Sequence, residues 1–232
     1  MALTFYDLPN DIIRELLCYY LSPDDVHACL LTSKIFHVML PHQLYRIIRP
    51  AWYNCIKKGS LLTCMKIYQL SIDVKQSLNI HKDNDFAFRE SCKNGYLEVV
   101  KWLYDVGLQL NSPINIHEDE ERAFRWSCWC GHLEVSKWLY DLSLQLNLPI
   151  NIHECNEYAF RMSCNGHLEV AKWLYDLGLQ INSPINIHTD NEYAFRWSCE
   201  SGDLEVVKWL CSLCDKYSIK IDNGKINYAI EN

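Results

Sequence analysis

The sequence has few residues that interrupt regular structure: of 232 residues, only 8 are Gly and 7 are Pro. This scarcity excludes a collagen-like or low-complexity chain. The sequence also lacks an apolar run of about 18 residues, so it predicts no membrane-spanning segment. The first residues lack the basic start and uninterrupted apolar stretch of a signal peptide. We therefore expect the 12 Cys to stay reduced in a cytosolic or nuclear setting.

Positive charge is scarce as well. Against 29 Asp and Glu stand 22 Lys and Arg, a net charge of −7. Residues 81–232 hold 23 of the acidic residues and only 14 of the basic ones. Such a chain repels phosphate groups, which argues against nucleic acid as a partner. The apolar content of 49% and the charged content of 22% are those of a chain that folds around a core.

What the sequence does contain is an internal repeat. Asn-Ile-His recurs at spacings of 36, 36 and 35 residues and marks the starts of repeats 1 to 4: His81, His117, His153 and His188. Ala-Phe-Arg, Ser-Cys, a Gly, Leu-Glu-Val and Lys-Trp-Leu follow in each. Residues 51–80 are a degenerate copy, and residues 227–230 begin like a further one that stops. We therefore expect residues 81–232 to hold four repeats with a partial C-terminal cap.

Each repeat predicts two short helices. In repeat 2, apolar residues at helical spacing predict one helix over about 121–129 and another over about 133–142. Gly131 between them allows the chain to leave the first helix through a left-handed residue. Helices this short are not stable alone in water, so each must bury its apolar face against the next repeat. We expect an all-α fold, an α-solenoid of paired helices with finger loops.

The repeats resemble ankyrin repeats in Gly-His-Leu-Glu-Val at residues 131–135 and 166–170. The family's Thr-Pro-Leu-His-x-Ala-Ala is represented by residues 122–128, with Ala123 in place of Pro and Arg125 in place of His. The repeats exceed the usual length of about 33 residues, with the excess in the finger. The sequence motifs of the repeats are similar to those of ankyrin-repeat proteins of large DNA viruses of amoebae. The resemblance implies a protein-binding module, in the host cytosol if the chain is viral.

Residues 1–50 do not repeat, and they predict three short helices. Leu8-Pro9, Asp25-Val26 and Lys34-Ile35-Phe36 resemble the F-box pattern, although Trp is commoner at the position of Phe36. The resemblance implies that residues 6–48 dock on the small adaptor subunit of SCF ubiquitin ligases. The implied contacts are Leu8, Pro9, Ile12, Leu16 and Val26. The alternative is a helical cap on the first repeat.

No residue set predicts catalysis, a cofactor or a metal. No nucleophile stands beside a suitable base, and no Gly-rich phosphate loop is present. Helical layers lie roughly 8–10 Å apart, whereas the ligands of one zinc ion lie about 2 Å from it. The repeated His therefore favours a structural role over a metal site, and the repeated Cys a core position. The Cys-x-x-Cys motif at Cys211 and Cys214 has no second Cys pair in the sequence, which argues against a metal or redox site there. The repeated Arg is expected to pair with a carboxylate of the neighbouring finger.

Target specificity is expected where the repeats differ, at the ends of the first helices and in the fingers. Trp129 stands out there, because Trp is enriched among interface hot spots. The alternative for Trp129 is packing on the adjacent finger. The acidic fingers favour a basic target, unless they are simply solvated. The expected target-binding residues are Lys93, Asn94, Glu121, Trp129, Cys130, Glu157, Glu192 and Glu200.

These observations together predict a protein-binding adaptor without chemistry of its own. The N-terminal segment would dock on an SCF-type ubiquitin ligase, and the ankyrin-like face would hold a protein target. The alternative is a scaffold or decoy that sequesters a host protein and has no link to ubiquitin.

Overall fold

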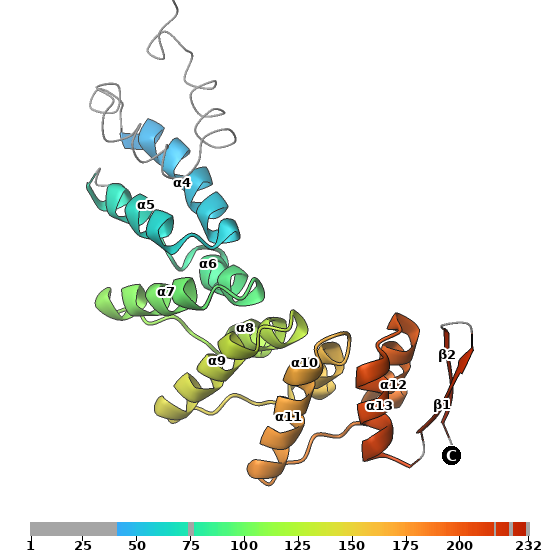
Figure 1. The fold of residues 1–232 in the computed structure, drawn as a ribbon. Helices are drawn as coiled ribbons and strands as arrows, with labels where there is room; N and C mark the ends of the chain where they lie inside the picture. Colours follow the sequence, from blue (N-terminus) through green and yellow to red (C-terminus); the bar gives the residue numbers. More distant parts are fainter. Residues whose placement is uncertain (1–40, 74–76, 216, 223–224, 231–232) are drawn as a thin grey trace, which may run out of the picture. The chain divides into compact units, whose positions relative to one another are not determined.

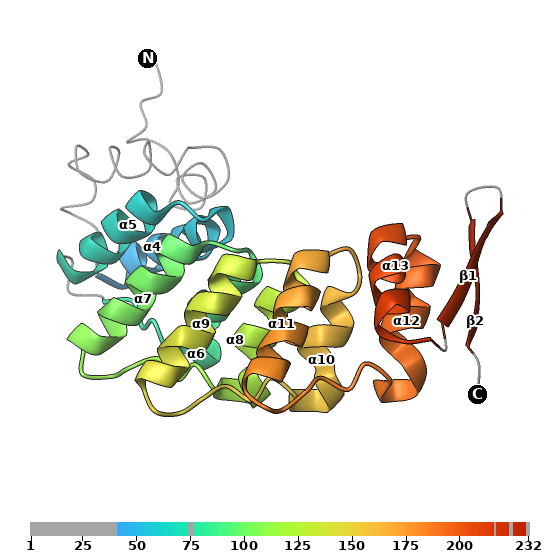
Figure 2. The same ribbon diagram turned by 60° about the horizontal axis from the view of Figure 1, so that its bottom comes forward.

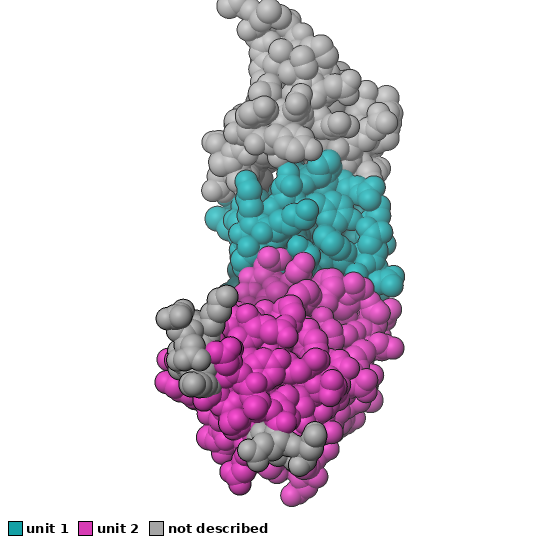
Figure 3. Space-filling view, turned by 90° about the vertical axis from the view of Figure 1, so that its right-hand side faces the viewer, with its two compact units in different colours: residues 1–91, 96–114 teal, residues 92–95, 115–232 magenta. Residues whose placement is uncertain are grey.

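A computed structural model describes residues 41–73, 77–215, 217–222 and 225–230. The chain forms two compact units, which Figure 3 colours separately. Unit 1 comprises Met1–Ser91 and Tyr96–Ile114, and unit 2 comprises Cys92–Gly95 and Asn115–Asn232. The expected ligase contacts lie outside the described residues: Leu8, Pro9, Ile12, Leu16 and Val26.

The described part of unit 1 is helical (Figure 1). Its helices are α4 (Pro41–Lys58), α5 (Leu61–Asp73), α6 (Lys82–Lys93, whose last two residues belong to unit 2) and α7 (Leu97–Gln109). Gly59, with a φ of 68°, separates α4 from α5 as the repeat pattern predicts. The Trp102 ring packs edge-on against Trp52 and Tyr68, at centroid distances of 6.0 and 5.7 Å. The degenerate copy thus packs against repeat 1 through aromatic rings.

Unit 2 contains the helix pairs of repeats 2 to 4. The helices are α8 (Glu118–Trp129), α9 (Leu133–Gln145), α10 (Glu154–Ser163), α11 (Leu168–Gln180), α12 (Thr189–Ser201) and α13 (Leu204–Leu213). Each first helix packs on the second helix of its own repeat, and α10 also packs on both α8 and α12. The first helices α8, α10 and α12 form one layer, and α9, α11 and α13 the other (Figure 2). This is the stacked arrangement that the short helices require.

The residues that repeat identically form the core of unit 2. Phe124, Phe160 and Phe195 have no exposed surface. The ring of Phe124 lies 6.1 Å from that of Trp173, and the Phe160 ring lies 6.2 Å from that of Trp209. A first-helix Phe therefore contacts the second-helix Trp of the following repeat, and this aromatic pairing joins neighbouring repeats.

A β-hairpin follows α13, where the sequence predicted the start of another helical repeat. Strand β1 (Tyr217–Asp222) pairs antiparallel with β2 (Lys225–Ile230), and Tyr217 stands opposite Ile230. The Tyr217 ring stacks on Phe195 at 3.9 Å. The expectation of a helical start at 227–230 is therefore corrected. Apolar and polar residues alternate over 217–222, and Asn223-Gly224 is typical of a hairpin turn, so the strand signal is present in the sequence.

Candidate functional site

Each first helix of unit 2 begins with an unusual left-handed turn. In α8, Asp119, Glu120 and Glu121 have φ angles of 56°, 56° and 62°. Residues 155–157 and 190–192 repeat this conformation in α10 and α12. For a residue other than Gly the left-handed conformation costs roughly 1–2 kcal/mol. The turn therefore requires compensating contacts.

In repeats 2 and 3 the repeated Arg supplies those contacts through backbone carbonyls. Arg125 Nε donates to Glu120 O at 2.6 Å, and its Nη2 donates to Asp119 O at 3.0 Å. Arg161 donates in the same way to the carbonyls of residues 155 and 156, at 3.2 and 2.7 Å. The expected pairing with a carboxylate of the neighbouring finger is found for Arg161, whose Nη1 lies 2.5 Å from Asp190 Oδ2. The partners common to both arginines are the carbonyls of their own repeat.

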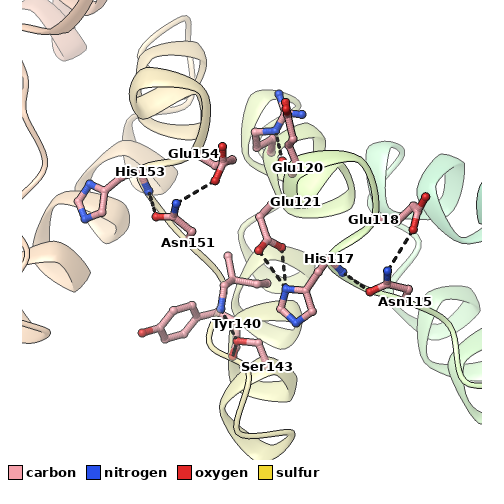
Figure 4. A network of polar contacts seen from close by, with 12 residues as sticks. Asn115, His117, Glu118, Glu120, Glu121, Tyr140, Ser143, Asn151, His153 and Glu154 are labelled. Carbon is pink, nitrogen blue, oxygen red and sulfur yellow. Dashed lines mark hydrogen bonds and ion pairs between the residues drawn. The ribbon is translucent and has the colours of Figure 1, made fainter.

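The repeated His contacts the last residue of the same turn. His117 Nδ1 lies 2.9 Å from Glu121 Oε1, and the His117 amide donates to Asn115 Oδ1 at 3.1 Å (Figure 4). His153 and Glu157 form the same pair. Among the described residues, no group of three or more His, Cys, Asp or Glu is arranged to hold a metal ion.

This pairing gives three of the expected target-binding carboxylates a partner inside the chain. Glu121 and Glu157 are only 8% and 6% exposed, and their carboxylates are hydrogen-bonded to histidines. Glu192 accepts a hydrogen bond from the Tyr217 hydroxyl at 2.5 Å. These three carboxylates have structural partners within unit 2, so their placement argues against a role as target contacts.

The opposite side of the first helices is exposed or half-buried and differs between repeats. It carries five aromatic side chains, which we name the aromatic strip: Trp126, Trp129, Tyr158, Tyr193 and Trp197. Trp129 and Trp197 are each 39% exposed. The identical positions between them in sequence, such as Ser127 and Cys128, are buried. Each first helix therefore has one buried side of constant sequence and one exposed side of varying sequence.

Contacts between neighbouring repeats connect the rings of the strip. Trp129 on α8 meets Tyr158 on α10 edge-on at 6.4 Å. Tyr193 and Trp197 stack within α12 at 5.8 Å. Trp129 thus packs against the next first helix, which modifies the expected packing on a finger, and it still keeps an exposed surface.

Cations of the chain itself lie over several of these rings. Arg122 Cζ lies 4.2 Å and Lys93 Nζ 5.1 Å from the Trp126 centroid. Arg125 lies 5.1 Å from the centroid of Tyr158, and Arg161 lies 5.0 Å from that of Tyr193. Guanidinium and ammonium groups therefore already use the ring faces of the strip.

The remaining expected contacts lie near the strip. Glu200 is exposed on α12, three residues after Trp197, and both follow Tyr193 at the spacing of one helix face. Cys130 and Asn94 are half-buried. The sequence prediction named Trp129 and missed the other four rings of the strip. The i, i+4, i+7 spacing of residues 193, 197 and 200 was the available signal.

The buried cysteines are poor nucleophiles. Burial raises the pKa of Cys128 to about 12, and burial together with nearby Cys211 and Glu200 raises that of Cys199 to about 12. Burial also raises the pKa of Cys211, with a further contribution from Cys214. At neutral pH these thiols stay protonated, so they act as small apolar side chains.

Comparison with known proteins supports an ankyrin architecture. Residues 153–210, which span α10, α11, α12 and most of α13, match the family of ankyrin repeats. No curated protein matches the chain. Together with the stacked helix pairs, this match defines an all-α ankyrin-type solenoid. Ankyrin repeats are generally non-enzymatic interaction modules, which supports a role in protein–protein interaction. In the described part of the chain, every helix is too short or too polar to cross a bilayer.

Proposed function

We propose that this chain is an adaptor that holds a protein target on the aromatic strip and presents it to an SCF-type ubiquitin ligase. The observation that carries target binding is the exposure of Trp129 and Trp197, 39% each, on helices whose other side is buried. Exposed Trp and Tyr side chains are typical of interface hot spots. Because the strip lies where the repeats differ, it provides a surface whose side chains change from one repeat to the next.

The ligase part of the proposal rests on the F-box-like pattern of residues 6–48. Leu8 and Ile12 would enter the adaptor subunit as apolar contacts of a helix, with Pro9, Leu16 and Val26 beside them. The chain would then act by proximity, because a target held near the ubiquitin-loaded enzyme has a high effective concentration.

Binding of the full chain to a purified SCF adaptor subunit tests this part. We expect the wild type to bind with a Kd below about 50 µM, and a Leu8→Asp, Ile12→Asp variant not to bind. A Trp129→Ala, Trp197→Ala variant is the matched control, and it should bind the adaptor subunit like the wild type. A wild type that fails to bind removes the ligase from the proposal.

A second candidate function is a scaffold or decoy that sequesters a host protein. It is favoured by the placement of the strip, which lies entirely on α8, α10 and α12 and requires nothing from residues 1–50. The two candidates differ in the fate of the captured protein. An adaptor shortens its half-life in a proteasome-dependent manner, whereas a decoy leaves the half-life unchanged.

A further inference from the structure

We infer that the aromatic strip binds an Arg- and Lys-rich segment of a protein partner, with cationic side chains over Trp197 and Trp129. The inference deepens the proposed function and rests on it, because it names the chemistry of the target. Three features of unit 2 carry it: the orientation of the rings, the distribution of the chain's own cations, and the surplus of carboxylates.

The rings of the strip are placed to accept cations. Arg122 lies 4.2 Å from the Trp126 centroid and Arg161 lies 5.0 Å from the Tyr193 centroid, within the usual range of about 6 Å. Of the five rings of the strip, all within the described residues, Trp126, Tyr158 and Tyr193 carry a cation of the chain, and Trp129 and Trp197 do not. The two most exposed rings of the strip are therefore those that an external cation would reach.

Unit 2 carries a surplus of carboxylates, and one of them follows Trp197 on the same helix face. Unit 2 contains 18 Asp and Glu against 11 Lys and Arg. Asp119 and Asp190, in the left-handed turns, keep 44% and 56% of their side chains exposed although Arg122 and Arg161 pair with them. Glu200 is exposed one helical turn after Trp197. A cation over Trp197 would thus lie beside a carboxylate, which adds charge complementarity to the ring contact.

This combination favours a basic segment over other ligands. An acidic or phosphorylated segment would meet the surplus of carboxylates and be repelled. A purely apolar segment would cover the rings but would leave Glu200 without a partner. An Arg or Lys side chain satisfies both, since its aliphatic stem packs on the ring and its charged head stays near the carboxylate.

Fluorescence anisotropy with the full chain and labelled synthetic peptides tests the inference. The probes are a peptide alternating Arg and Ser, a matched peptide alternating Glu and Ser, and an oligothymidylate. We expect the wild type to bind the Arg peptide, and added salt to weaken that binding. Trp197→Ala should weaken it about two- to thirty-fold. Glu200→Gln should weaken it less and reduce its dependence on salt.

Leu179→Ala is the matched control. Leu179 is 51% exposed at the end of α11, away from the strip, and its truncation should leave binding unchanged. Circular dichroism and thermal unfolding of each variant separate lost binding from lost folding. Equal binding of the Glu and Arg peptides, preference for oligothymidylate, or full binding by the Trp129→Ala, Trp197→Ala variant overturns the inference.

The outcome is distinguishable from failure of the proposed function. If the Arg peptide does not bind, but cellular proteins captured by the wild type are lost from the double Trp variant, the strip is a target site and only its cationic chemistry is wrong. If the double variant keeps every captured protein, the strip is not the target site, and target binding as proposed here fails as well.

Discussion

The two sides of α8, α10 and α12 differ in how much their sequence varies between repeats. On the buried side every repeat has the same residues, and Phe124, Phe160 and Phe195 are fully enclosed. On the exposed side the equivalent positions hold Trp126, Met162 and Trp197. The buried side joins neighbouring repeats, and the exposed side distinguishes them. In the proposed function, stability and target choice are therefore assigned to different residues of the same helix.

A second exposed apolar region sharpens this contrast. The ends of α9 and α11 carry Leu144 and Leu179, 47% and 51% exposed, and Leu146 and Ile181 follow them at 42% each. These positions are aliphatic in both repeats. A surface that is the same in successive repeats offers little discrimination between target proteins. Leu179 therefore serves as the control position for the aromatic strip.

The largest effect should come from the buried side. Phe160→Ala removes a fully buried ring that contacts Trp209 of the next repeat, so we expect a loss of about 3–5 kcal/mol in the free energy of unfolding. Urea denaturation followed by circular dichroism measures it. A loss below about 1 kcal/mol would show that the contact between repeats does not depend on this ring.

Two inter-helix glycines offer a matched pair. Gly131 and Gly202 both have left-handed φ angles, 78° and 80°. A Cβ on Gly131 would lie 2.4 Å from His167 Nδ1, whereas one on Gly202 would meet nothing within 4 Å. Each Ala variant should lose about 1–2 kcal/mol from strain, and Gly131→Ala should lose about 1–3 kcal/mol more from the clash.

A double variant isolates the clash. Adding His167→Ala should recover part of the loss in Gly131→Ala and none in Gly202→Ala. Equal losses of unfolding free energy in the two single Ala variants would mean that the His167 side chain moves away from the added Cβ without destabilising the fold.

The left-handed turn should depend on a guanidinium. Arg161→Gln removes its hydrogen bonds to residues 155 and 156 and its ion pair with Asp190, so we expect a loss of about 1.5–3 kcal/mol. Arg161→Lys should not restore it, because an ammonium lacks the planar fork that reaches two carbonyls. Thermal unfolding measures the losses. Arg122→Gln, at an exposed ion pair, should cost about 0.5 kcal/mol and serves as the comparison.

The exposed side should contribute little to stability. Trp197→Ala loses a stacked contact with Tyr193 on a surface that is 39% exposed, so we expect a loss of about 1 kcal/mol or less. The same denaturation experiment as for Phe160→Ala measures it. A loss as large as that of Phe160→Ala would erase the difference between the two sides.

The smallest effect should be a dependence on pH at the junction of repeats 1 and 2. Burial lowers the pKa of His132 below 6.5, with nearby His167 lowering it further. Below that pH the unfolded chain takes up a proton more readily than the folded one, so the stability contributed at neutral pH is lost as the pH falls.

Tyr96 supplies the variant that tests this titration. It occupies the position of His132 one repeat earlier, and its hydroxyl donates to the Lys57 carbonyl at 2.9 Å. His132→Tyr should therefore lose less stability than the wild type between about pH 7.5 and about pH 5. Identical losses, measured by urea denaturation at both pH values, would exclude His132 as the source.

The helix pairs and their Gly turns were predictable because their signals are local and recur. The left-handed turn was not. Acidic residues such as Asp119 and Glu120 are also what an ordinary first helical turn prefers. What stabilises the turn is Arg125, and its hydrogen bonds to carbonyls leave no mark in the spacing of apolar residues. The hairpin was missed because the partial repeat at 227–230 masked a clear alternation of apolar and polar residues.

The aromatic strip was predicted only in part, because its ring contacts form only when the repeats stack. Trp129 stands out within its own repeat, but its partner Tyr158 lies on the next first helix, and only stacking brings the two rings together. The prediction of Glu121 and Glu157 as target contacts did not take into account that both stand four residues after a His that hydrogen-bonds to them. That i, i+4 spacing was readable in the sequence.

The hairpin also restricts how such an array could lengthen. Between repeats 3 and 4, Glu157 accepts a hydrogen bond from the amide of Asn186, and in repeat 4 the Tyr217 hydroxyl takes the corresponding role at Glu192. A duplicated segment inserted after α13 would have to displace Tyr217 from Phe195, whereas one inserted before α12 leaves that ring contact intact. New repeats, whether they arise by gene duplication or by protein engineering, are therefore best added before α12. Each added repeat there brings a new set of exposed positions that can vary.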